Sequence, residues 1–284
     1  MKIDTLILSG GGPSGIAYLG ILKCLFDKQI LNKNLIGIKE IITTSIGIFF
    51  SILLLLKVPL NIIEKLILKY DFNNFININE IQINDILVDF GLFETSGIHI
   101  FIKTILKNFQ GVDDLSLKEL YNLTKIKLTV KVFNVSRKQL EYISHETDPD
   151  LSIITLGQMT TSIPFFFKPV IYNNHKYVDG GLRGHYPIEQ CKSDNYLGIF
   201  IMGGTFPDKS ELIQLFPILE FLYSLTIHQD QTYYDIKMNQ KNNKIIYLKV
   251  NYGLNFDMKK EDKIKIISRA YIETKKQIKK FKQK

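Results

Sequence analysis

The chain has 284 residues, of which 45% are hydrophobic and 23% charged, so it can bury a sizeable core. This composition excludes an extensively disordered chain. The formal net charge is +8, but the eleven basic and three acidic residues of Lys259–Lys284 account for all of it, so no nucleic-acid partner is expected.

The two cysteines, Cys24 and Cys191, lie far apart and form no CxxC pair. This spacing argues against a disulfide framework and a zinc site, and it is typical of a reducing compartment. The first twelve residues hold one lysine and a short apolar run interrupted by Asp4, which is not the pattern of a secretory signal. We therefore expect a cytoplasmic protein.

A strand, a glycine-rich loop and a helix open the chain. Ile3–Leu8 is apolar and β-branched, Gly10–Gly15 follows it, and Ile16–Gln29 carries apolar residues at helical spacing. Ile36–Thr43 predicts a second strand. Such a strand–helix–strand unit indicates a parallel sheet with a right-handed crossover.

The segment Ile41–Leu56 contains no charged residue and must be weighed against a transmembrane alternative. It is shorter than the roughly 18 to 20 apolar residues that a bilayer requires. We expect instead a strand end, a sharp turn at Ser45 and a buried helix over Ile46–Lys57, hydrophobic on all sides. A further helix should run from Pro59 to Tyr70.

Residues 71–125 predict a helical insertion that could form a lid, with helices at Ser96–Asn108 and Ser116–Leu123. The later elements expected are strands at Ile126–Val135, Gln139–Ser144, Tyr196–Ile201 and Lys244–Val250, and helices at 211–239 and 260–281. We therefore predict one large domain, residues 1–258, followed by a basic C-terminal helix, residues 259–284.

The glycine-rich loop contains Gly10, Gly11, Gly12 and Gly15. Successive glycines let the backbone turn its N–H groups toward one point at the start of a helix, where an anion or oxyanion would bind. The same residues satisfy the GxGxxG pattern, so a nucleotide-binding protein is an alternative. That site requires an acidic residue at the end of the second strand, whereas Glu40 precedes this end.

Ser45 lies where the second strand meets the next helix. In a nucleophile elbow, the serine hydroxyl is exposed above the sheet, and small residues two positions before and after it prevent clashes. Gly47 meets this requirement, but Thr43 is β-branched, and we expect it to strain the turn. The alternative is that Ser45 only caps the helix.

Asp179 ends an apolar, strand-like stretch and is followed by Gly180 and Gly181. Asp-Gly is also a common turn, so this motif alone is ambiguous. The order of the three motifs favours a catalytic interpretation: a glycine loop, a serine turn, and an aspartate far downstream.

With these motifs in this order, the chain resembles the patatin-like phospholipase family over about residues 3–202. The residues that carry the resemblance are LILSGGGPSGIAYLGIL, ITTSIGIFFSILL and SIPFFFKPVIYNNHKYVDGGLRGHYPI. It implies an α/β/α sandwich with a mostly parallel sheet and a lipid acyl hydrolase that cleaves phospholipid or acylglycerol esters.

The resemblance also implies the roles of individual residues. Ser45 would be the nucleophile, Asp179 its general base, and the N–H groups of Gly11 and Gly12 the oxyanion donors. A dyad without histidine is workable if the Asp179 carboxylate reaches the Ser45 hydroxyl in a partly dry pocket. This mechanism requires no metal or cofactor.

Three residues depart from the family pattern. Thr43 replaces the first glycine of GxSxG, Ser14 stands where Arg or Lys is usual, and His185 stands where Asn commonly precedes the Pro. One alternative is therefore an impaired enzyme that keeps the fold for lipid binding. Another is a conventional triad that uses His185 or His228.

The basic C-terminal helix has two interpretations. Ile264, Ile267, Tyr271, Ile278 and Phe281 can line one face, with lysines around it. This face either docks on the core or lies on an anionic membrane or lipid-droplet surface, where each basic residue contributes roughly 1 kcal/mol.

Overall fold

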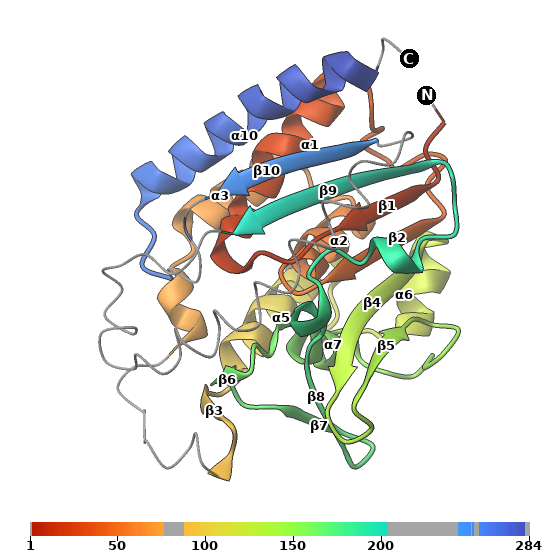
Figure 1. Cartoon of the computed structure of the whole chain (residues 1–284), viewed down its shortest axis with the longest axis vertical. Coiled ribbons are helices and arrows are strands. Elements are labelled where there is room, and N and C mark those ends of the chain that lie inside the picture. Colours follow the sequence, from red (N-terminus) through yellow and green to blue (C-terminus); the bar gives the residue numbers. More distant parts are fainter. Residues whose placement is uncertain (1, 77–87, 204–243, 251, 253–255, 282–284) are drawn as a thin grey trace.

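The computed structural model describes residues 2–76, 88–203, 244–250, 252 and 256–281 (Figure 1). Its main sheet contains the strands β1 (Thr5–Leu8), β2 (Glu40–Thr44), β4 (Lys127–Asn134), β5 (Gln139–Ile143), β7 (Val170–Tyr172), β8 (His175–Asp179), β9 (Tyr196–Gly203) and β10 (Ile245–Val250). Their order is β10-β9-β1-β2-β4-β8-β7, with β5 paired to β4. A second sheet pairs β3 (Gly91–Phe93) with β6 (Phe165–Phe167).

Helices flank this sheet. They are α1 (Ala17–Asp27), α2 (Gly47–Leu55), α3 (Leu60–Lys69), α5 (Ser96–Gln110), α6 (Leu117–Thr124), α7 (Ile153–Thr161) and α10 (Lys260–Phe281). Short 3₁₀ helices are η1 (Gly12–Ile16), η2 (Phe72–Phe75), η4 (Gly180–Arg183) and η5 (Ile188–Gln190). The pairs of β1 with β2 and β9, of β2 with β4, and of β9 with β10 are parallel. The expected α/β class with a mostly parallel sheet is thus confirmed.

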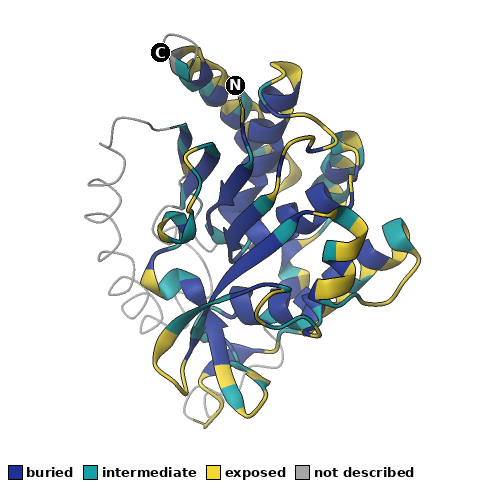
Figure 2. Cartoon of the chain, turned by 90° about the vertical axis from the view of Figure 1, so that its right-hand side faces the viewer, coloured by how far each residue is buried: buried dark blue, intermediate teal, exposed yellow. Residues whose placement is uncertain are grey.

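The central strands are buried on both faces, as the apolar sequence of a parallel sheet requires. Figure 2 shows burial along these strands and exposure in the turns and outer helices. Leu6 and Leu8 belong to the main core, whereas Ile7 packs with Tyr186, Phe200 and Ile245 on the other face. The alternation of side chains along β1 therefore contributes to two apolar clusters.

The second strand begins four residues later than expected. Ile36 is exposed, and Leu35 and Gly37 have φ angles of 55° and 90°, so a turn precedes β2. The predicted helices at 211–239 lie outside the described residues. The other elements expected from apolar periodicity agree with observed ones to within a few residues.

The uncharged segment Ile41–Leu56 forms β2, the turn at Ser45 and α2, and only Ile46 within it is not buried. The residues of α2 are buried on every side of the helix. Within the described residues, no helix has both the length and the apolar character needed to cross a bilayer. The hydrophobicity of this segment therefore reflects its place in the core.

The insertion is only partly helical. α5 and α6 lie where helices were expected, but the described part also contains η2 and the strand β3, which pairs with β6. The two helices expected in the insertion are therefore accompanied by a short strand that was not expected, because Gly91–Phe93 pairs with a strand some 70 residues later. Residues 77–87 of the insertion lie outside the described residues.

The C-terminal helix α10 packs along α1 (Figure 1). Gly20 permits this approach, because a Cβ there would lie 2.1 Å from the carbonyl oxygen of Ile267. Ile267 and Ile278 are buried, Tyr271 and Phe281 are half-buried, and Ile264 is exposed. Of the two interpretations of this face, the docked one agrees with the structure, because α1 covers the buried residues of α10.

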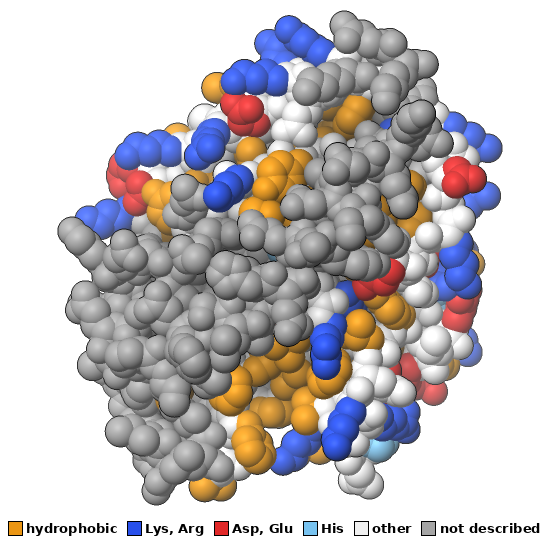
Figure 3. Space-filling view, viewed as in Figure 1, with side chains coloured by type: hydrophobic (Ala, Val, Ile, Leu, Met, Phe, Trp, Pro, Cys, Tyr) orange, Lys and Arg blue, Asp and Glu red, His pale blue; other side chains and the backbone are white. Residues whose placement is uncertain are grey.

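The outer side of α10 is basic. Lys265, Arg269, Lys275, Lys276 and Lys279 are exposed. Figure 3 shows Lys and Arg side chains along the edge where Figure 1 draws α10, with few Asp and Glu among them. The docked helix thus presents charge to its surroundings.

Candidate active site

The glycine loop begins directly after β1. Gly11 has a φ of 147° and Gly12 a φ of 52°, and η1 starts at Gly12. Side chains rarely adopt such backbone angles, which explains why glycines occupy both positions. The amide of Gly10 donates a 2.6 Å hydrogen bond to the carbonyl oxygen of His185, which fixes the start of the loop.

Ser45 occupies the turn between β2 and α2 with a φ of 51°. This angle is uncommon for a residue with a side chain, and such strain recurs at functional positions. The Ser45 amide donates a 2.9 Å hydrogen bond to Thr160 Oγ1, and α2 begins two residues after Ser45. The positive end of the α2 dipole therefore lies beside the Ser45 hydroxyl.

The threonine at position 43 does not strain this turn. Thr43 continues β2 in register with Leu8 on one side and Val130 on the other, and the positive φ falls on Ser45. Gly47 provides the room, because a Cβ at residue 47 would lie 2.3 Å from Thr43 Oγ1 and 2.9 Å from the Ser9 carbonyl oxygen. The expected strain at Thr43 is therefore wrong, since Gly47 accommodates its side chain.

The sheet register brings Asp179 to the level of Ser45. Thr44 pairs with Lys131 of β4, so Ser45 follows at the level of Val132, and Val132 pairs with Asp179 of the antiparallel strand β8. Side-chain hydrogen bonding with Ser45 lowers the pKa of Asp179, which places the two side chains next to each other. Two residues 134 positions apart thus form one polar pair across β4.

Asp179 is buried, and burial raises its pKa to about 6. The hydrogen bond from Ser45, the amide of Gly181 and the charges of His185 and Lys131 oppose this rise. The Gly181 amide donates its bond to Asp179 Oδ1 over 2.7 Å. A carboxylate with this pKa is ionised at neutral pH and is a stronger base than an exposed aspartate.

The other motif glycines allow close packing around the pair. A Cβ at Gly10 would lie 3.1 Å from Ser45 Cβ, and one at Gly15 would lie 2.5 Å from Ile46 Cγ1. A Cβ at Gly180 would lie 2.7 Å from the carbonyl oxygen of Lys131. The glycine loop, the serine turn and the aspartate loop therefore meet in one place.

An apolar pocket opens at this place, with an empty volume of about 730 Å³ that includes its mouth. Gly12 and Ser45 contribute to its wall. The apolar residues that surround it are Pro13, Ile16, Ile46, Phe49, Phe50, Leu53, Ile67, Phe72, Phe75, Ile98, Phe101, Ile163, Phe167 and Phe256. A pocket with this lining suits a hydrocarbon chain rather than a phosphate group.

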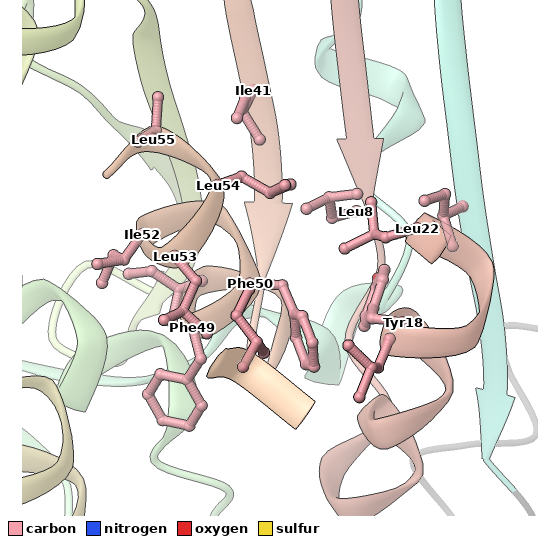
Figure 4. Packing of buried hydrophobic residues seen from close by; sticks show 14 of the residues in the cluster. Leu8, Tyr18, Leu22, Ile41, Phe49, Phe50, Ile52, Leu53, Leu54 and Leu55 are labelled. Carbon is pink, nitrogen blue, oxygen red and sulfur yellow. The ribbon is translucent and has the colours of Figure 1, made fainter. Parts of the chain in front are cut away.

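Much of the aromatic wall of the pocket comes from α2 and from the insertion. Phe49 of α2 lies 5.1 Å, centroid to centroid, from Phe101 of α5, and Phe75 lies 5.7 Å from Phe101. In Figure 4, Phe50 points toward Tyr18 of α1, and their rings are 4.9 Å apart. The insertion thus contributes aromatic side chains that α2 alone could not provide.

The remaining expected residues have different surroundings. The Cβ of His185 approaches Gly10 and Gly181, and its charge lowers the pKa of Asp179, whereas His228 lies outside the described residues. Ser14 is fully buried in η1, and its hydroxyl has no hydrogen-bond partner among the described residues. No three His, Cys, Asp or Glu side chains gather into a metal-binding group in the described part of the chain.

Sequence reasoning missed two residues of this site. Thr160 holds the Ser45 amide, and its hydroxyl donates a 2.8 Å hydrogen bond to the Lys131 carbonyl. Lys131 lies on β4 with a wholly buried side chain. A threonine on a short apolar helix gives no sequence signal, but a lone lysine within the apolar run LTVKVF is unusual and could have been noticed.

Comparisons with known proteins show which sequences the chain is similar to. The sequence model of the family described as patatin-like phospholipase matches residues 6–192. A probable lipid hydrolase of Invertebrate iridescent virus 6 is 31% identical over 185 residues, which cover 65% of this chain and 62% of that protein. An uncharacterized protein of Acanthamoeba polyphaga mimivirus is 24% identical over 272 residues, 92% of this chain and 89% of that protein.

Two solved structures share the fold. VipD from Legionella pneumophila superposes with a TM-score of 0.64 at 16% identity, over 97% of this chain and 66% of that one. Full-length ExoU of Pseudomonas aeruginosa, solved in complex with SpcU, gives 0.55 at 13% identity, over 98% and 52%. The chain thus spans less than two thirds of the iridescent virus protein and of either solved chain.

Proposed function

The chain belongs to the patatin-like phospholipase family, and from this premise we propose that it hydrolyses an ester bond of a phospholipid or an acylglycerol. The observation that carries the proposal is the placement of Ser45 at the level of the buried Asp179 carboxylate, whose pKa it lowers, beside an apolar pocket lined by Ser45 itself. In this proposal Ser45 is the nucleophile and Asp179 is its general base.

The reaction would proceed in two halves. Ser45 Oγ attacks the ester carbonyl carbon while Asp179 takes the hydroxyl proton, and the resulting oxyanion accepts hydrogen bonds from the amides of Gly11 and Gly12. The bond to the alcohol then breaks, and Asp179 returns its proton to the departing oxygen. Water attacks the acyl-enzyme by the same route, which releases the fatty acid and restores Ser45.

The electrostatics of the pair suit this role. Burial raises the pKa of Asp179 to about 6, so at pH 7 the carboxylate is mostly ionised yet more basic than an exposed one. The α2 dipole and the glycine amides favour the negative charge that develops next to Ser45. We expect a rate that falls as Asp179 becomes protonated below about pH 6.

The lining of the pocket supports the proposed substrate class. Its wall consists almost entirely of Phe, Ile and Leu side chains, which would bury an acyl chain and would leave phosphate groups unsatisfied. This argues against the nucleotide-binding alternative. The exposed lysines of α10 would add attraction to an anionic membrane or lipid-droplet surface, where such substrates are found.

The proposal is tested with a fluorophosphonate probe, which modifies only an activated serine. The wild-type chain should be labelled at Ser45 and should hydrolyse a short soluble ester. Ser45→Ala and Asp179→Asn should each lose both activities by at least about 10³-fold, and the double variant should be no slower than either. Ser268→Ala, which removes an exposed serine of α10, is the matched control.

The outcomes separate the alternatives. An unlabelled but folded wild-type chain that still binds fatty acid would favour an impaired enzyme that retains lipid binding. Labelling that survives Asp179→Asn would refute the assigned base. Labelling at another serine would refute the assigned nucleophile.

A further inference from the structure

Lys131 has an unusual environment for a lysine. Its side chain is wholly buried, and its ammonium donates three hydrogen bonds, to the carbonyl oxygens of Arg183 at 2.9 Å and Gly184 at 2.7 Å and to Glu189 Oε1 at 2.6 Å. The Tyr142 hydroxyl donates to the same Glu189 oxygen. All three ammonium donors are therefore used, as a buried charge requires.

The segment that Lys131 binds, residues 180–190, connects two parts of the proposed site, the Asp179 carboxylate and the glycine loop. It begins directly after Asp179, and its His185 carbonyl accepts the 2.6 Å hydrogen bond from the Gly10 amide. Lys131 grips the two carbonyls that immediately precede His185. One ammonium group thus fixes the segment that links the aspartate to the glycine loop.

The backbone of the same residue supports the serine turn. The Lys131 carbonyl accepts a 2.8 Å hydrogen bond from Thr160 Oγ1, and this oxygen accepts the bond from the Ser45 amide. Gly180 packs so tightly on Lys131 that a Cβ there would lie 2.8 Å from Lys131 Cγ. Lys131 is therefore joined by short paths to Ser45, Asp179 and the glycine loop.

We propose that Lys131 is a positioning residue that sets the relative placement of Asp179 and the Gly10–Gly12 loop through residues 180–190. The proposal rests on the proposed hydrolase function. It makes the Lys131 side chain necessary for the geometry of the reaction, not for contact with the substrate. Loss of this grip would leave the pocket in place but would misplace the base and the oxyanion donors.

The charge of Lys131 gives a second signature. The groups that act on the Asp179 carboxylate are the Ser45 hydroxyl, the Gly181 amide, His185 and Lys131, and the last of these has the smallest effect. The ammonium lowers the pKa of Asp179, so replacement by a neutral side chain should raise it. The acid limb of the rate profile would then move to higher pH.

The test compares Lys131→Met with Lys127→Met. Lys127 lies on the same strand and also bonds to carboxylates, those of Glu40 and Glu146, but at the first residue of β4, four positions before Lys131. Lys131→Met should slow fluorophosphonate labelling of Ser45 by about 10- to 100-fold, because misplacement of about 1 Å has this effect. The KM of Lys131→Met for a soluble ester should stay at the wild-type value, and the acid limb of its pH–rate profile should move to higher pH. Lys127→Met should have the labelling rate, KM and pH profile of the wild type.

A merely structural role is separated by the double variant Lys131→Met/Glu189→Gln. Removal of the unpaired Glu189 charge should restore thermal stability but not the labelling rate. Equal recovery of thermal stability and labelling rate in the double variant would overturn the proposal. It would also be overturned if Lys131→Met were labelled at the wild-type rate and the acid limb of its pH–rate profile were unchanged. If Lys131→Met does not fold, Glu189→Gln and Tyr142→Phe replace it in the test, and each should slow labelling of Ser45 without a change in KM. Wild-type labelling rates in both variants would overturn the proposal.

Hydrogen–deuterium exchange separates this proposal from the proposed function. Lys131→Met should speed exchange in the peptides that contain Gly10 and Gly181, and Lys127→Met should not. If the wild-type chain is never labelled, the hydrolase proposal fails. Faster exchange of these peptides in Lys131→Met would still support the positioning role of Lys131. Unchanged exchange in both peptides would overturn it.

Discussion

The backbone amide of Ser45 and the hydroxyl of Thr160 are joined by a 2.9 Å hydrogen bond across 115 positions of sequence. Thr160 Oγ1 donates in turn to the Lys131 carbonyl, so this one oxygen links the serine turn, α7 and β4. Both residues are buried. A turn with a positive φ at Ser45 is therefore held from outside by a bond that neighbouring residues do not provide.

Thr160→Val should weaken both stability and activity. The substitution leaves the Ser45 amide and the Lys131 carbonyl without this partner in a buried site, which costs about 1–3 kcal/mol. Thermal denaturation measures this loss, and fluorophosphonate labelling should slow severalfold because the Ser45 turn relaxes. Thr160→Ser keeps the oxygen and is the control; an equal loss in both variants would point to methyl packing instead.

Asp179→Asn should stabilise the protein while it abolishes hydrolysis. Burial raises the pKa of Asp179 to about 6 from an ordinary value of 3.8, so the ionised group destabilises the folded state above pH 6. This penalty disappears as the pH falls from 6 toward 3.8. The variant should gain up to about 3 kcal/mol in the free energy of unfolding at pH 8 and none at pH 3.5. A gain that does not depend on pH would contradict the raised pKa.

Substitutions at Thr43 and at Gly47 should have different effects, although the two residues are in contact. Thr43 Oγ1 is buried without a hydrogen-bond partner among the described residues, so Thr43→Val should keep labelling and should not lower stability. Gly47→Ala should lose labelling, because its Cβ would meet Thr43 Oγ1 and the carbonyl oxygens of Ser9 and Leu8. Labelling and melting temperatures measure both, and an active, stable Gly47→Ala would refute the packing argument.

Much of the fold could be predicted from local pattern. Ile3–Leu8 and the glycines after it have the periodicity and turn residues of a strand–loop–helix unit, and β1, η1 and α1 follow that order. Ser45 and Asp179 could be singled out because each lies at the end of a strand with a glycine within the next two residues. Parallel neighbours end at the same edge of a sheet, so β1 and β2 had to bring the glycine loop to Ser45.

The missed features depend on contacts between distant residues. Thr160 and Lys131 matter because β4 and α7 meet behind Ser45, and β3 exists because β6 pairs with it. The spacing of apolar residues in α10 predicts an apolar face but not what this face packs against. A helix that docks on α1 and one that lies on a membrane have the same pattern. Likewise, Thr43 looked strained until the space at Gly47 was known.

His185→Gln separates a dyad from a triad. A histidine that acts as general base contributes about 10²- to 10⁴-fold to the rate, so its loss from a triad would be severe. The dyad predicts a labelling rate within about one order of magnitude of the wild type, with a modest rise in the pKa of Asp179 because the charge of His185 lowers it. His99→Gln, on the exposed side of α5, is the control.

The final prediction concerns the charged side of α10. Lys275, Lys276 and Lys279 are exposed, whereas the apolar face of the helix packs on the core, so membrane attraction should be electrostatic rather than insertive. Replacement of these three lysines with Gln should reduce binding to anionic vesicles at low salt and should spare hydrolysis of a soluble ester. Wild-type binding should itself weaken as salt rises, since the Debye length falls from about 10 Å at 0.1 M to about 3 Å at 1 M.

The matched control for α10 replaces Lys33, Lys118 and Lys138, which are exposed elsewhere on the chain, with Gln. Both triple variants lose the same charge, so an equal fall in vesicle binding would indicate a general effect of net charge. A fall confined to the α10 variant would assign the contact to this helix. Binding that persists in high salt would require apolar insertion, which the packing of Ile267 and Ile278 against the core does not allow without undocking the helix. Loss of soluble-ester activity in the α10 variant would show that these lysines support the folded core instead.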